Sequence, residues 1–265
     1  MIERVIFTDL DGTLLDADTY SWEPAIPALR LIEEKGIPLV MVSSKTRLEI
    51  EACRDEIGNS HPFIPENGGA IFFPKNYGLE IPPEAVEIGK YRAVVLSRTA
   101  AEMVKKFDTL SPKIPVQFVS EMETEQVVEL TGLSFEQARS AQAREFGQAF
   151  KLTDEGISEQ TLEAAVRGIG LNLTRGERFF HLMDQTGKGR AVRVLTELYQ
   201  RNSPGLTTVG LGNSPNDESF LSVVDKPFLI ALSNGGHVQM DIKGLTRVPM
   251  AGPAGFNQVI LELLA

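Results

Sequence analysis

The sequence predicts an α/β protein whose core is a mostly parallel sheet interrupted by an inserted α+β unit. Short apolar runs, "RVIFTD" (4–9) and "IPLVMVSS" (37–44), alternate with amphipathic segments at the start of the chain. This pattern is typical of strands buried on both faces and joined by right-handed helical crossovers. The alternation stops in the middle of the chain and later returns, which indicates an insertion into the first unit.

The first part of the core is expected to alternate strands and helices. Residues 23–35 are amphipathic, and residues 46–57 begin with Thr46, which can cap a helix, and stop at Gly58. The stretch "PFIPENGGAIFF" (62–73) predicts two strands joined by a turn.

The paired prolines of "EIPPEA" (80–85) mark the expected start of the insertion, because proline interrupts both helices and strands. We therefore expect a core of residues 1–82 and 183–265 and an inserted domain of residues 83–182. Within the insertion, "SFEQARSAQAREFGQAF" (134–150) is expected to be helical. The returning core is predicted as a helix at 188–201, a strand "LTTVGLG", a helix at 215–223, a strand "PFLIAL" and a helix after "GPAG".

The amino-acid composition and net charge limit the kinds of molecule that this protein is expected to bind. Of 265 residues, 42% are hydrophobic and 23% are charged, as in ordinary folded proteins, and the net charge is −10. Such a charge disfavours nucleic acid and anionic membranes, so a small-molecule partner is expected. No apolar stretch is long enough to cross a membrane, and Cys53, the single cysteine, fits a reducing compartment. A cytoplasmic protein is expected.

Two carboxylates follow the first apolar run in "VIFTDLDGTLLD" (5–16). Burying Asp9 and Asp11 would be costly unless something pairs with them. Residues two apart on a strand point to one side, and ligands bind beyond the carboxyl ends of strands in open α/β sheets. Both carboxylates could therefore face one site. The alternative is an ordinary turn, since Asp and Gly are common turn residues.

Further polar residues follow other predicted strands or open helices. Ser43 ends the second apolar run, where its hydroxyl could bind a phosphate oxygen or simply cap the next helix. Lys188 opens a helix, where the dipole disfavours a cation, so we interpret it as holding an anion. The turn "GLGNSPNDESF" (210–220) contributes Asn213, Asn216 and Asp217.

Other motifs are excluded. A nucleotide-triphosphatase phosphate loop needs Gly at 182, where the chain has Leu, and a dinucleotide fingerprint needs Gly at 215, where it has Pro. The histidines His61, His181 and His237 are too scattered for a zinc site. We interpret His181, Cys53 and Trp22 as structural residues.

The segments "DLDGT", "VMVSSKT", "GKGRA" and "GLGNSPND", in this order, resemble the haloacid dehalogenase (HAD) superfamily of phosphotransferases. The resemblance covers the whole chain and implies a HAD-like Rossmannoid core, with the insertion as a large α/β cap. A closer resemblance is to the mannosyl-3-phosphoglycerate phosphatase family, in "SSKTRLE", "PFIPENGGAIF", "TGLSFEQA", "ERFFHLMD" before "KGRA", and "GPAGFNQ". The cap departs from that family where Gly147, Gln148 and Ala149 replace an expected Ser-Glu-Pro.

The resemblance assigns roles to individual residues. Asp9 is implied as the nucleophile, Asp11 as the general acid and base, and Lys188 as a catalytic ligand of the phosphoryl group. The implied cofactor is Mg²⁺, held by Asp9, the Asp11 carbonyl and the loop from Asn213 to Asp217, with both of these loop residues expected as ligands. Family members generally carry Asp in place of Asn213, so weak Mg²⁺ binding is expected. The implied substrate-binding residues are Thr13, Ser43, Ser44, Lys45, Thr46, Arg47, Glu66, Asn67, Gly68, Gly69, Arg144, Arg178 and Asn216, with Asn216 also expected to orient Lys188.

The activity so implied is Mg²⁺-dependent hydrolysis of a phosphorylated sugar–glycerate compound, most closely mannosyl-3-phosphoglycerate. Another capped sugar-phosphate phosphatase or a phosphomutase is the alternative within the superfamily. A non-catalytic binder of phosphorylated metabolites is a third alternative, favoured only by Asn213.

Overall fold

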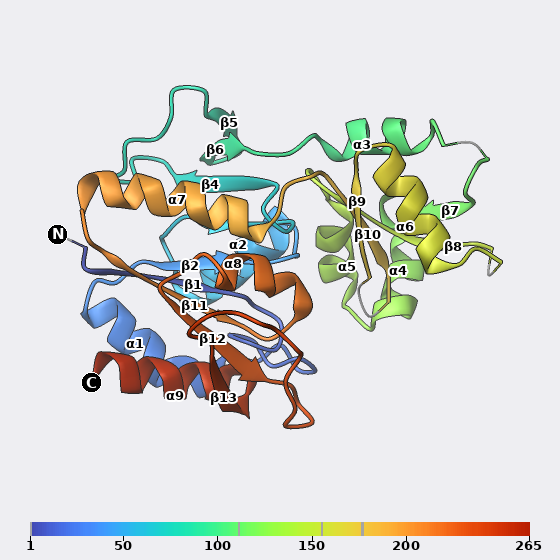
Figure 1. Cartoon of the computed structure of the whole chain (residues 1–265). Helices are drawn as coiled ribbons and strands as arrows, with labels where there is room; N and C mark the ends of the chain where they lie inside the picture. The colour runs from blue at the N-terminus through green and yellow to red at the C-terminus, as the bar shows by residue number, and fades with distance from the viewer. Residues whose placement is uncertain (1, 111, 155, 176–177) are drawn as a thin grey trace.

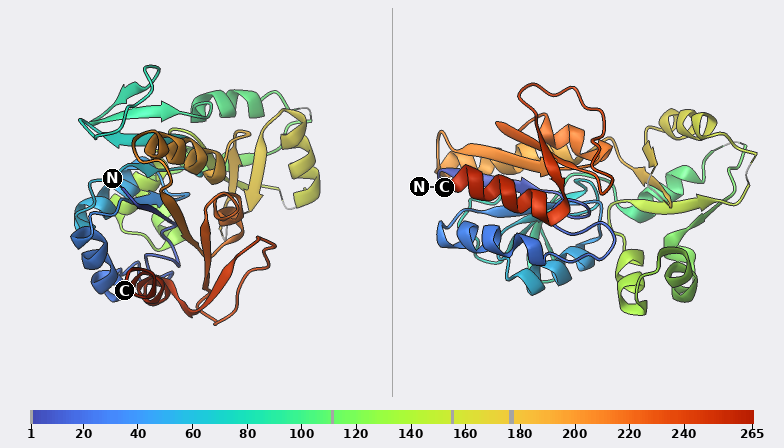
Figure 2. Two further views of the ribbon diagram at one scale, coloured as in Figure 1. Left: turned by 60° about the vertical axis from the view of Figure 1, so that its left-hand side comes forward. Right: turned by 90° about the horizontal axis from the view of Figure 1, so that it is seen from below.

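The computed structural model describes residues 2–110, 112–154, 156–175 and 178–265. Figure 1 shows two lobes, a core built from both ends of the chain and a smaller cap built from its middle. Both termini lie at the end of the core that is remote from the cap, as the right-hand view in Figure 2, seen from below, also shows.

The core sheet is mixed and largely parallel. Over the described residues it has nine strands in the order β13 (Thr246–Ala251), β12 (Lys226–Ala231), β11 (Thr207–Gly212), β1 (Arg4–Thr8), β2 (Leu39–Val42), β3 (Phe63–Ile64), β4 (Ala70–Pro74), β6 (Tyr91–Val95) and β5 (Val86–Ile88). Neighbours from β13 to β3 are parallel, and β4, β6 and β5 continue the sheet antiparallel. The carboxyl ends of β11, β1 and β2 therefore meet near the middle of one edge.

Helices cover both faces of this sheet (Figure 1). One face packs against α1 (Ile26–Glu34), α2 (Arg47–Ile57) and α9 (Gly252–Leu264), and the other against α7 (Lys188–Asn202) and α8 (Glu218–Leu221). Along β1, Ile6 joins the first hydrophobic core while Val5 and Phe7 join the second. Because both faces are buried, the strand is a continuous apolar run rather than an alternating one.

The cap has its own antiparallel sheet and hydrophobic core. Its strands follow the order β7 (Val116–Phe118), β8 (Gln148–Leu152), β10 (Phe180–Met183) and β9 (Asn172–Arg175). Phe107, Phe118, Phe150 and Phe180 pack ring against ring in this core. The cap helices are α3 (Ala100–Phe107), α4 (Thr124–Thr131), α5 (Phe135–Gln142) and α6 (Glu159–Gly168). Three short 3₁₀ helices complete the described structure: η2 (Val119–Glu121) in the cap, and η1 (Glu23–Ala25) and η3 (Pro215–Asp217) in the core.

The observed sheet corrects the expected start of the insertion at residue 83. Strands β5 and β6 pair with each other, and β6 pairs with β4, so residues 86–95 belong to the core sheet. The paired prolines at 82 and 83 interrupt the chain within the core rather than between the lobes. The chain leaves the core after Val95 and returns after Met183.

Of two helices predicted from the sequence, the structure confirms the one at residues 46–57 and only the first half of the one at residues 134–150. Helix α2 begins and ends as predicted, with Thr46 and Glu49 forming a capping box and Gly58 in the left-handed conformation at φ 77°. The predicted helix 134–150 is wrong in its second half, because α5 ends at Gln142 and residues 148–152 form the strand β8. Among the described residues, no helix is both long and apolar enough to span a membrane.

Candidate active site

Asp9 lies directly beyond β1, at the edge where the parallel strands end. Its backbone N–H donates to the carbonyl of Leu211 on β11 over 2.9 Å, and the residue is only 5% exposed. Gly12 turns the chain with φ +74°, and a Cβ there would lie 2.2 Å from Nδ2 of Asn213. The first loop therefore packs directly against the loop that follows β11, and only glycine allows this approach.

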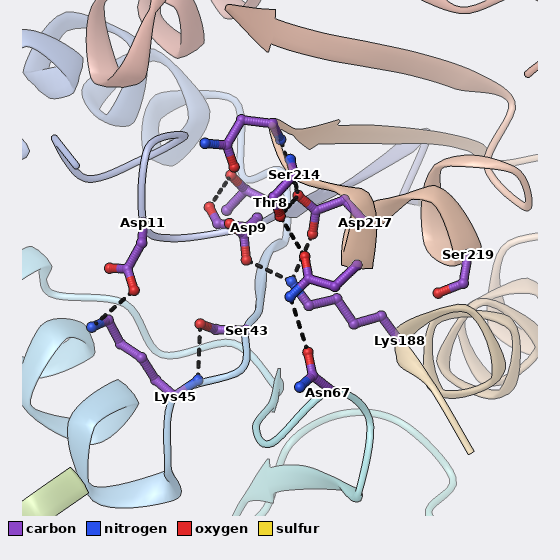
Figure 3. A network of polar contacts seen from close by, with 12 residues as sticks. Thr8, Asp9, Asp11, Ser43, Lys45, Asn67, Lys188, Ser214, Asp217 and Ser219 are labelled. Carbon is purple, nitrogen blue, oxygen red and sulfur yellow. Dashed lines mark hydrogen bonds and ion pairs between the residues drawn. The ribbon is translucent and has the colours of Figure 1, made fainter. Parts of the chain in front are cut away.

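Lys188, the first residue of α7, bridges two buried carboxylates. Its Nζ donates to Oδ1 of Asp9 over 2.6 Å and to Oδ1 of Asp217 over 2.7 Å, and its side chain is 1% exposed (Figure 3). The start of α7 is close-packed against α8, since a Cβ on Gly189 would lie 2.1 Å from the carbonyl oxygen of Ser219. This close packing of α7 against α8 fixes the backbone position from which the Lys188 side chain extends.

Both carboxylate oxygens of Asp217 are engaged. Oδ1 accepts from Lys188, and Oδ2 accepts from the backbone N–H of Asn213 and from the backbone N–H and hydroxyl of Ser214, each over 3.0 Å. In this geometry Asp217 holds Lys188 and closes the loop after β11, and its expected role as a metal ligand stays a prediction. Asn216, expected to orient Lys188, donates instead to Oδ1 of Asn67 over 3.3 Å and accepts from Ser214.

The electrostatics of this buried cluster disfavour the ionised form of Asp9. Burial and repulsion from Asp217 raise the pKa of Asp9 to about 7, against the attraction of Lys188. Burial alone would lower the pKa of Lys188, but the two carboxylates raise it above its usual value, so the ammonium stays charged. One cation therefore faces two carboxyl groups, and an additional positive charge would be stabilised here.

Asp11 points away from Asp9 and toward Lys45 (Figure 3). Its Oδ2 lies 3.1 Å from Nζ of Lys45, which is also 3.7 Å from Oε1 of Glu49 and 4.7 Å from the ring centre of Tyr20. The expectation that both carboxylates face one point is thus not met by the side chains. The alternation rule fails because β1 ends at Thr8, and the following residues form a turn.

Three buried oxygen atoms in this region lack a hydrogen-bond partner among the described residues. They are Oδ1 of Asp11, Oγ1 of Thr13 and Oδ1 of Asn213. Buried polar atoms are rarely left unpaired, so these atoms indicate an absent ligand. Together with the two carboxyl groups around Lys188, an oxygen-only donor set fits a hard cation such as Mg²⁺.

Ser43 and the turn at residues 66–69 lie beside this cluster. The backbone N–H of Asn67 donates to the carbonyl of Ser43 over 2.9 Å. Glu66, Asn67 and Gly68 adopt left-handed conformations in succession, with φ of 48°, 57° and 93°, and a Cβ on Gly68 would lie 2.4 Å from the carbonyl oxygen of Gly187. Such strain is retained where the surrounding structure enforces it, commonly at functional sites.

Several residues expected to bind substrate instead join the core to the cap. The Thr46 hydroxyl donates to the carbonyl of Ser140 over 2.8 Å. Arg47 donates to both carboxylate oxygens of Glu145, over 2.9 and 3.2 Å. Glu66 accepts from the backbone N–H groups of Glu145 and Phe146 over 2.8 and 3.0 Å.

The remaining predicted substrate residues are distributed unevenly. Gly69 touches the cap, since a Cβ on it would lie 2.2 Å from Cβ of Phe146. Arg144 donates to the carbonyl of Ser44 over 3.4 Å, and its Nε is buried without a partner among the described residues. Arg178 is exposed on the cap and donates to the carbonyl of Thr131. No hydrogen bond between described residues joins Arg178 to the Asp9 cluster.

The structure adds residues that the sequence reasoning missed. Ser214 supports Asp217, and its place inside "GNSPND" was the available signal. Tyr20 and Glu49 flank Lys45, and no spacing rule connects Tyr20 to that lysine. These two residues and Lys45 line a cavity of about 500 Å³ between α2 and the start of cap helix α5, where Leu133, Ser134 and Gln137 form the opposite wall.

A buried lysine–carboxylate cluster at the carboxyl edge of a mostly parallel sheet, in a chain with an inserted cap, is the arrangement of a capped α/β protein with its ligand site at the strand ends. A family profile described as haloacid dehalogenase-like hydrolase matches residues 6–238. The chain belongs to this family and is an enzyme of the hydrolase class. The match confirms the superfamily and the fold class that the motifs implied.

Curated relatives cover nearly the whole chain. A glucosyl-3-phosphoglycerate/mannosyl-3-phosphoglycerate phosphatase of Methanococcoides burtonii is 39% identical over 99% of this chain and 98% of its own. A protein of the same name from Persephonella marina is 38% identical over 98% and 97%.

Solved structures share the fold at lower identity. A Thermoplasma acidophilum protein has a TM-score of 0.69 at 17% identity, covering 100% of both chains. The HAD subclass IIB sugar phosphatase BT4131 has a TM-score of 0.62 at 17% identity, covering 98% of both.

Proposed function

We propose that this protein is a Mg²⁺-dependent phosphomonoesterase that hydrolyses mannosyl- or glucosyl-3-phosphoglycerate through an aspartyl-phosphate on Asp9. The observation that carries the proposal is the buried carboxylate of Asp9, held on Oδ1 by Lys188 at 2.6 Å. Among the described residues, Lys188 alone hydrogen-bonds this carboxylate, so Oδ2 is left to attack phosphorus. The names of the two curated relatives supply the substrate class.

The proposed reaction uses the two aspartates in turn. An oxygen of Asp9 attacks phosphorus in line, the new O–P bond forms, and the P–O bond to the leaving group breaks. Asp11 gives its proton to the leaving oxygen and then takes a proton from the water that attacks the aspartyl-phosphate. Inorganic phosphate leaves and Asp9 is regenerated. Lys45 holds Asp11 as a carboxylate in the structure, so this role requires Asp11 to leave Lys45, take up a proton from solvent and turn toward the leaving oxygen. Burial raises the pKa of Asp11 and Lys45 lowers it, so losing the lysine favours the protonated form.

The charge in the site has to be balanced for this chemistry. Lys188, Ser43 and Thr13 are proposed to bind phosphoryl oxygens. All three are buried, Lys188 contacts Asp9, and the buried Oγ1 of Thr13 has no partner among the described residues. The cation would be held by Asp9, the Asp11 carbonyl and Asn213, and when bound it would neutralise charge on the phosphoryl group. In phosphoryl transfer, such positioning and neutralisation provide most of the acceleration.

The leaving group has room between the lobes. The cavity beside Lys45 is lined by apolar and polar side chains, among them the carboxylates of Glu49, Glu56 and Glu136, which can accept hydrogen bonds from the hydroxyl groups of a sugar. Lys45 is the cation at this wall, and a glycerate carboxylate needs such a donor. The contacts of Thr46, Arg47 and Glu66 with the cap keep this wall in place.

Phosphate release from a panel of sugar phosphates tests the proposal. Release is expected from mannosyl- and glucosyl-3-phosphoglycerate, only with added Mg²⁺, and Asp9→Asn is expected to abolish it while the protein remains folded by circular dichroism. Substantial turnover by a folded Asp9→Asn variant would overturn the nucleophile. An isomeric product without free phosphate would identify a phosphomutase instead.

A further inference from the structure

The contact between Asp11 and Lys45 presents a problem for the proposed reaction. A general acid must come within hydrogen-bond distance of the oxygen it protonates. That oxygen leaves a phosphoryl group held between Asp9 and Lys188, whereas Figure 3 shows the Asp11 carboxylate turned away from both, toward Lys45. Asp11 is therefore held outside the position in which it would act.

Lys45 is well placed to hold it there. Its side chain is 14% exposed, and its ammonium is fixed by Asp11, Glu49 and the ring of Tyr20. The Asp11 side chain is 41% exposed as a whole, although its Oδ1 is buried, and that oxygen has no hydrogen-bond partner among the described residues. Opening the ion pair with Lys45 would therefore leave the carboxylate without another polar contact to hold it in place. Rotation of such a side chain is fast compared with turnover.

Lys45 also lines the cavity proposed to receive the leaving group, where the other charged lining groups are the carboxylates of Glu49, Glu56 and Glu136. A leaving-group carboxylate would therefore find its cationic partner on this wall in Lys45. A carboxylate arriving there can take the place of Asp11 on the ammonium, so the lysine exchanges one anionic partner for another. A neutral leaving group cannot do this, because it would strip a largely buried ammonium of a partner, which is costly. The exchange therefore depends on the charge of the substrate rather than on its size.

We propose that the Lys45–Asp11 ion pair is a substrate-operated gate: Lys45 withholds Asp11 until a carboxylate on the leaving group displaces it. This inference rests on the proposed function and extends it. It makes Lys45 a positioning residue for the acid as well as a ligand, and it assigns to the pair a selectivity for phosphomonoesters that carry a carboxylate next to the ester.

Three probes and one matched variant test the gate. The first probe is mannosyl-3-phosphoglycerate, and the second is its analogue with the carboxylate reduced to a primary alcohol. The third is p-nitrophenyl phosphate, whose leaving group needs no proton. Lys45→Met is compared with Lys90→Met, which removes an exposed lysine 3.8 Å from Glu51 and Asp55.

In Lys45→Met we expect kcat/KM for mannosyl-3-phosphoglycerate to fall about tenfold or more, the range for loss of a charged contact. Over the same substitution, kcat for the reduced analogue is expected to rise severalfold. Turnover of p-nitrophenyl phosphate is expected to rise as well, because its leaving group has no carboxylate and Asp11 must still activate the water that attacks the aspartyl-phosphate. In the double variant Lys45→Met/Asp11→Asn, the increase in kcat for the reduced analogue should disappear, because that increase depends on the Asp11 carboxyl group being free to act. Lys90→Met should change none of these values.

The outcomes separate the two proposals. If the wild-type protein releases phosphate from none of the probes, the proposed function fails. If it releases phosphate but Lys45→Met lowers turnover of both mannosyl compounds alike, or leaves the analogue unchanged, the gate is overturned and Lys45 is only a substrate ligand or a structural residue.

Discussion

The carboxylate of Asp217 lies 2.7 Å from Nζ of Lys188, and both side chains are buried. The same carboxylate accepts three hydrogen bonds from Asn213 and Ser214 on its other oxygen. Asp217 thus ties the position of the lysine to the loop that would carry the cation. A single side chain therefore couples Lys188 to the loop of the proposed cation site, the two groups that are proposed to neutralise the phosphoryl oxygens.

Asp217→Asn is therefore expected to reduce catalysis more than stability. The amide keeps the shape of the side chain but cannot hold the ammonium as a carboxylate does, so kcat/KM should fall by about 10²–10³, or roughly 3–4 kcal/mol of barrier. Phosphate release and urea unfolding measure the two effects. Asp225→Asn, which weakens the bonds to Thr208 on β11, is the control and should affect stability alone. Equal kcat/KM values for wild type and Asp217→Asn would contradict this role.

Asn213→Asp is expected to tighten Mg²⁺ binding by about tenfold or more, because more anionic ligands strengthen binding of a hard cation. The buried Oδ1 of Asn213 has no partner among the described residues, so the new charge would face the cation rather than disrupt an existing bond. Isothermal titration of the two proteins with Mg²⁺ measures the change. Asn234→Asp, on an exposed turn, is the control. Unchanged or weaker affinity of the Asn213 variant would count against Asn213 as a ligand.

Much of the fold could be predicted because local signals and burial agree. The apolar runs before Asp9 and Ser43 are strands buried on both faces, and the residues at their ends meet at one edge, as parallel pairing requires. The insertion boundary was misplaced because prolines mark a break in the chain but not which lobe the next strand joins. Strands β5 and β6 pair only through long-range contacts with β4, which local sequence cannot reveal.

The site was predictable as a set of residues but not as a set of contacts. The motifs brought Asp9, Lys188 and Asp217 together, and the structure places them in one cluster. Which oxygen faces which donor depends on three-dimensional packing, so the engagement of Asp217 and the turn of Asp11 toward Lys45 were not foreseen. Arg47 and Thr46 carry donors that suit a substrate, yet their partners lie on the cap.

Gly69→Ala is expected to destabilise the joint between the lobes. The added Cβ would lie 2.2 Å from Cβ of Phe146, a contact that requires backbone movement, so unfolding free energy should fall by about 1–3 kcal/mol. Urea denaturation measures this loss. Gly78→Ala is the matched control, since a Cβ there meets nothing within 4 Å. Similar stability of the two variants would mean that the lobes separate readily at this contact.

The buried imidazole of His61 makes stability depend on pH. Its Nδ1 lies 2.8 Å from the hydroxyl of Tyr77, and burial together with the nearby Arg54 lowers its pKa to about 4 from 6.5. The unfolded chain therefore takes up a proton near pH 6.5 that the folded protein takes up only near pH 4. The contribution of neutral His61 is complete above pH 6.5 and is lost as the pH falls from there to about 4.

Replacing His61 by a residue that does not titrate should make the unfolding free energy less dependent on pH. Between pH 7.5 and pH 5, the wild-type protein is expected to lose about 1–2 kcal/mol more unfolding free energy than His61→Gln, which has no titrating ring. Urea unfolding at the two pH values measures the difference, and the contribution of His181, whose pKa is also lowered by burial, cancels because both proteins contain it. Equal losses in the two proteins would show that His61 titrates alike in the folded and unfolded chains, contrary to its burial against Tyr77.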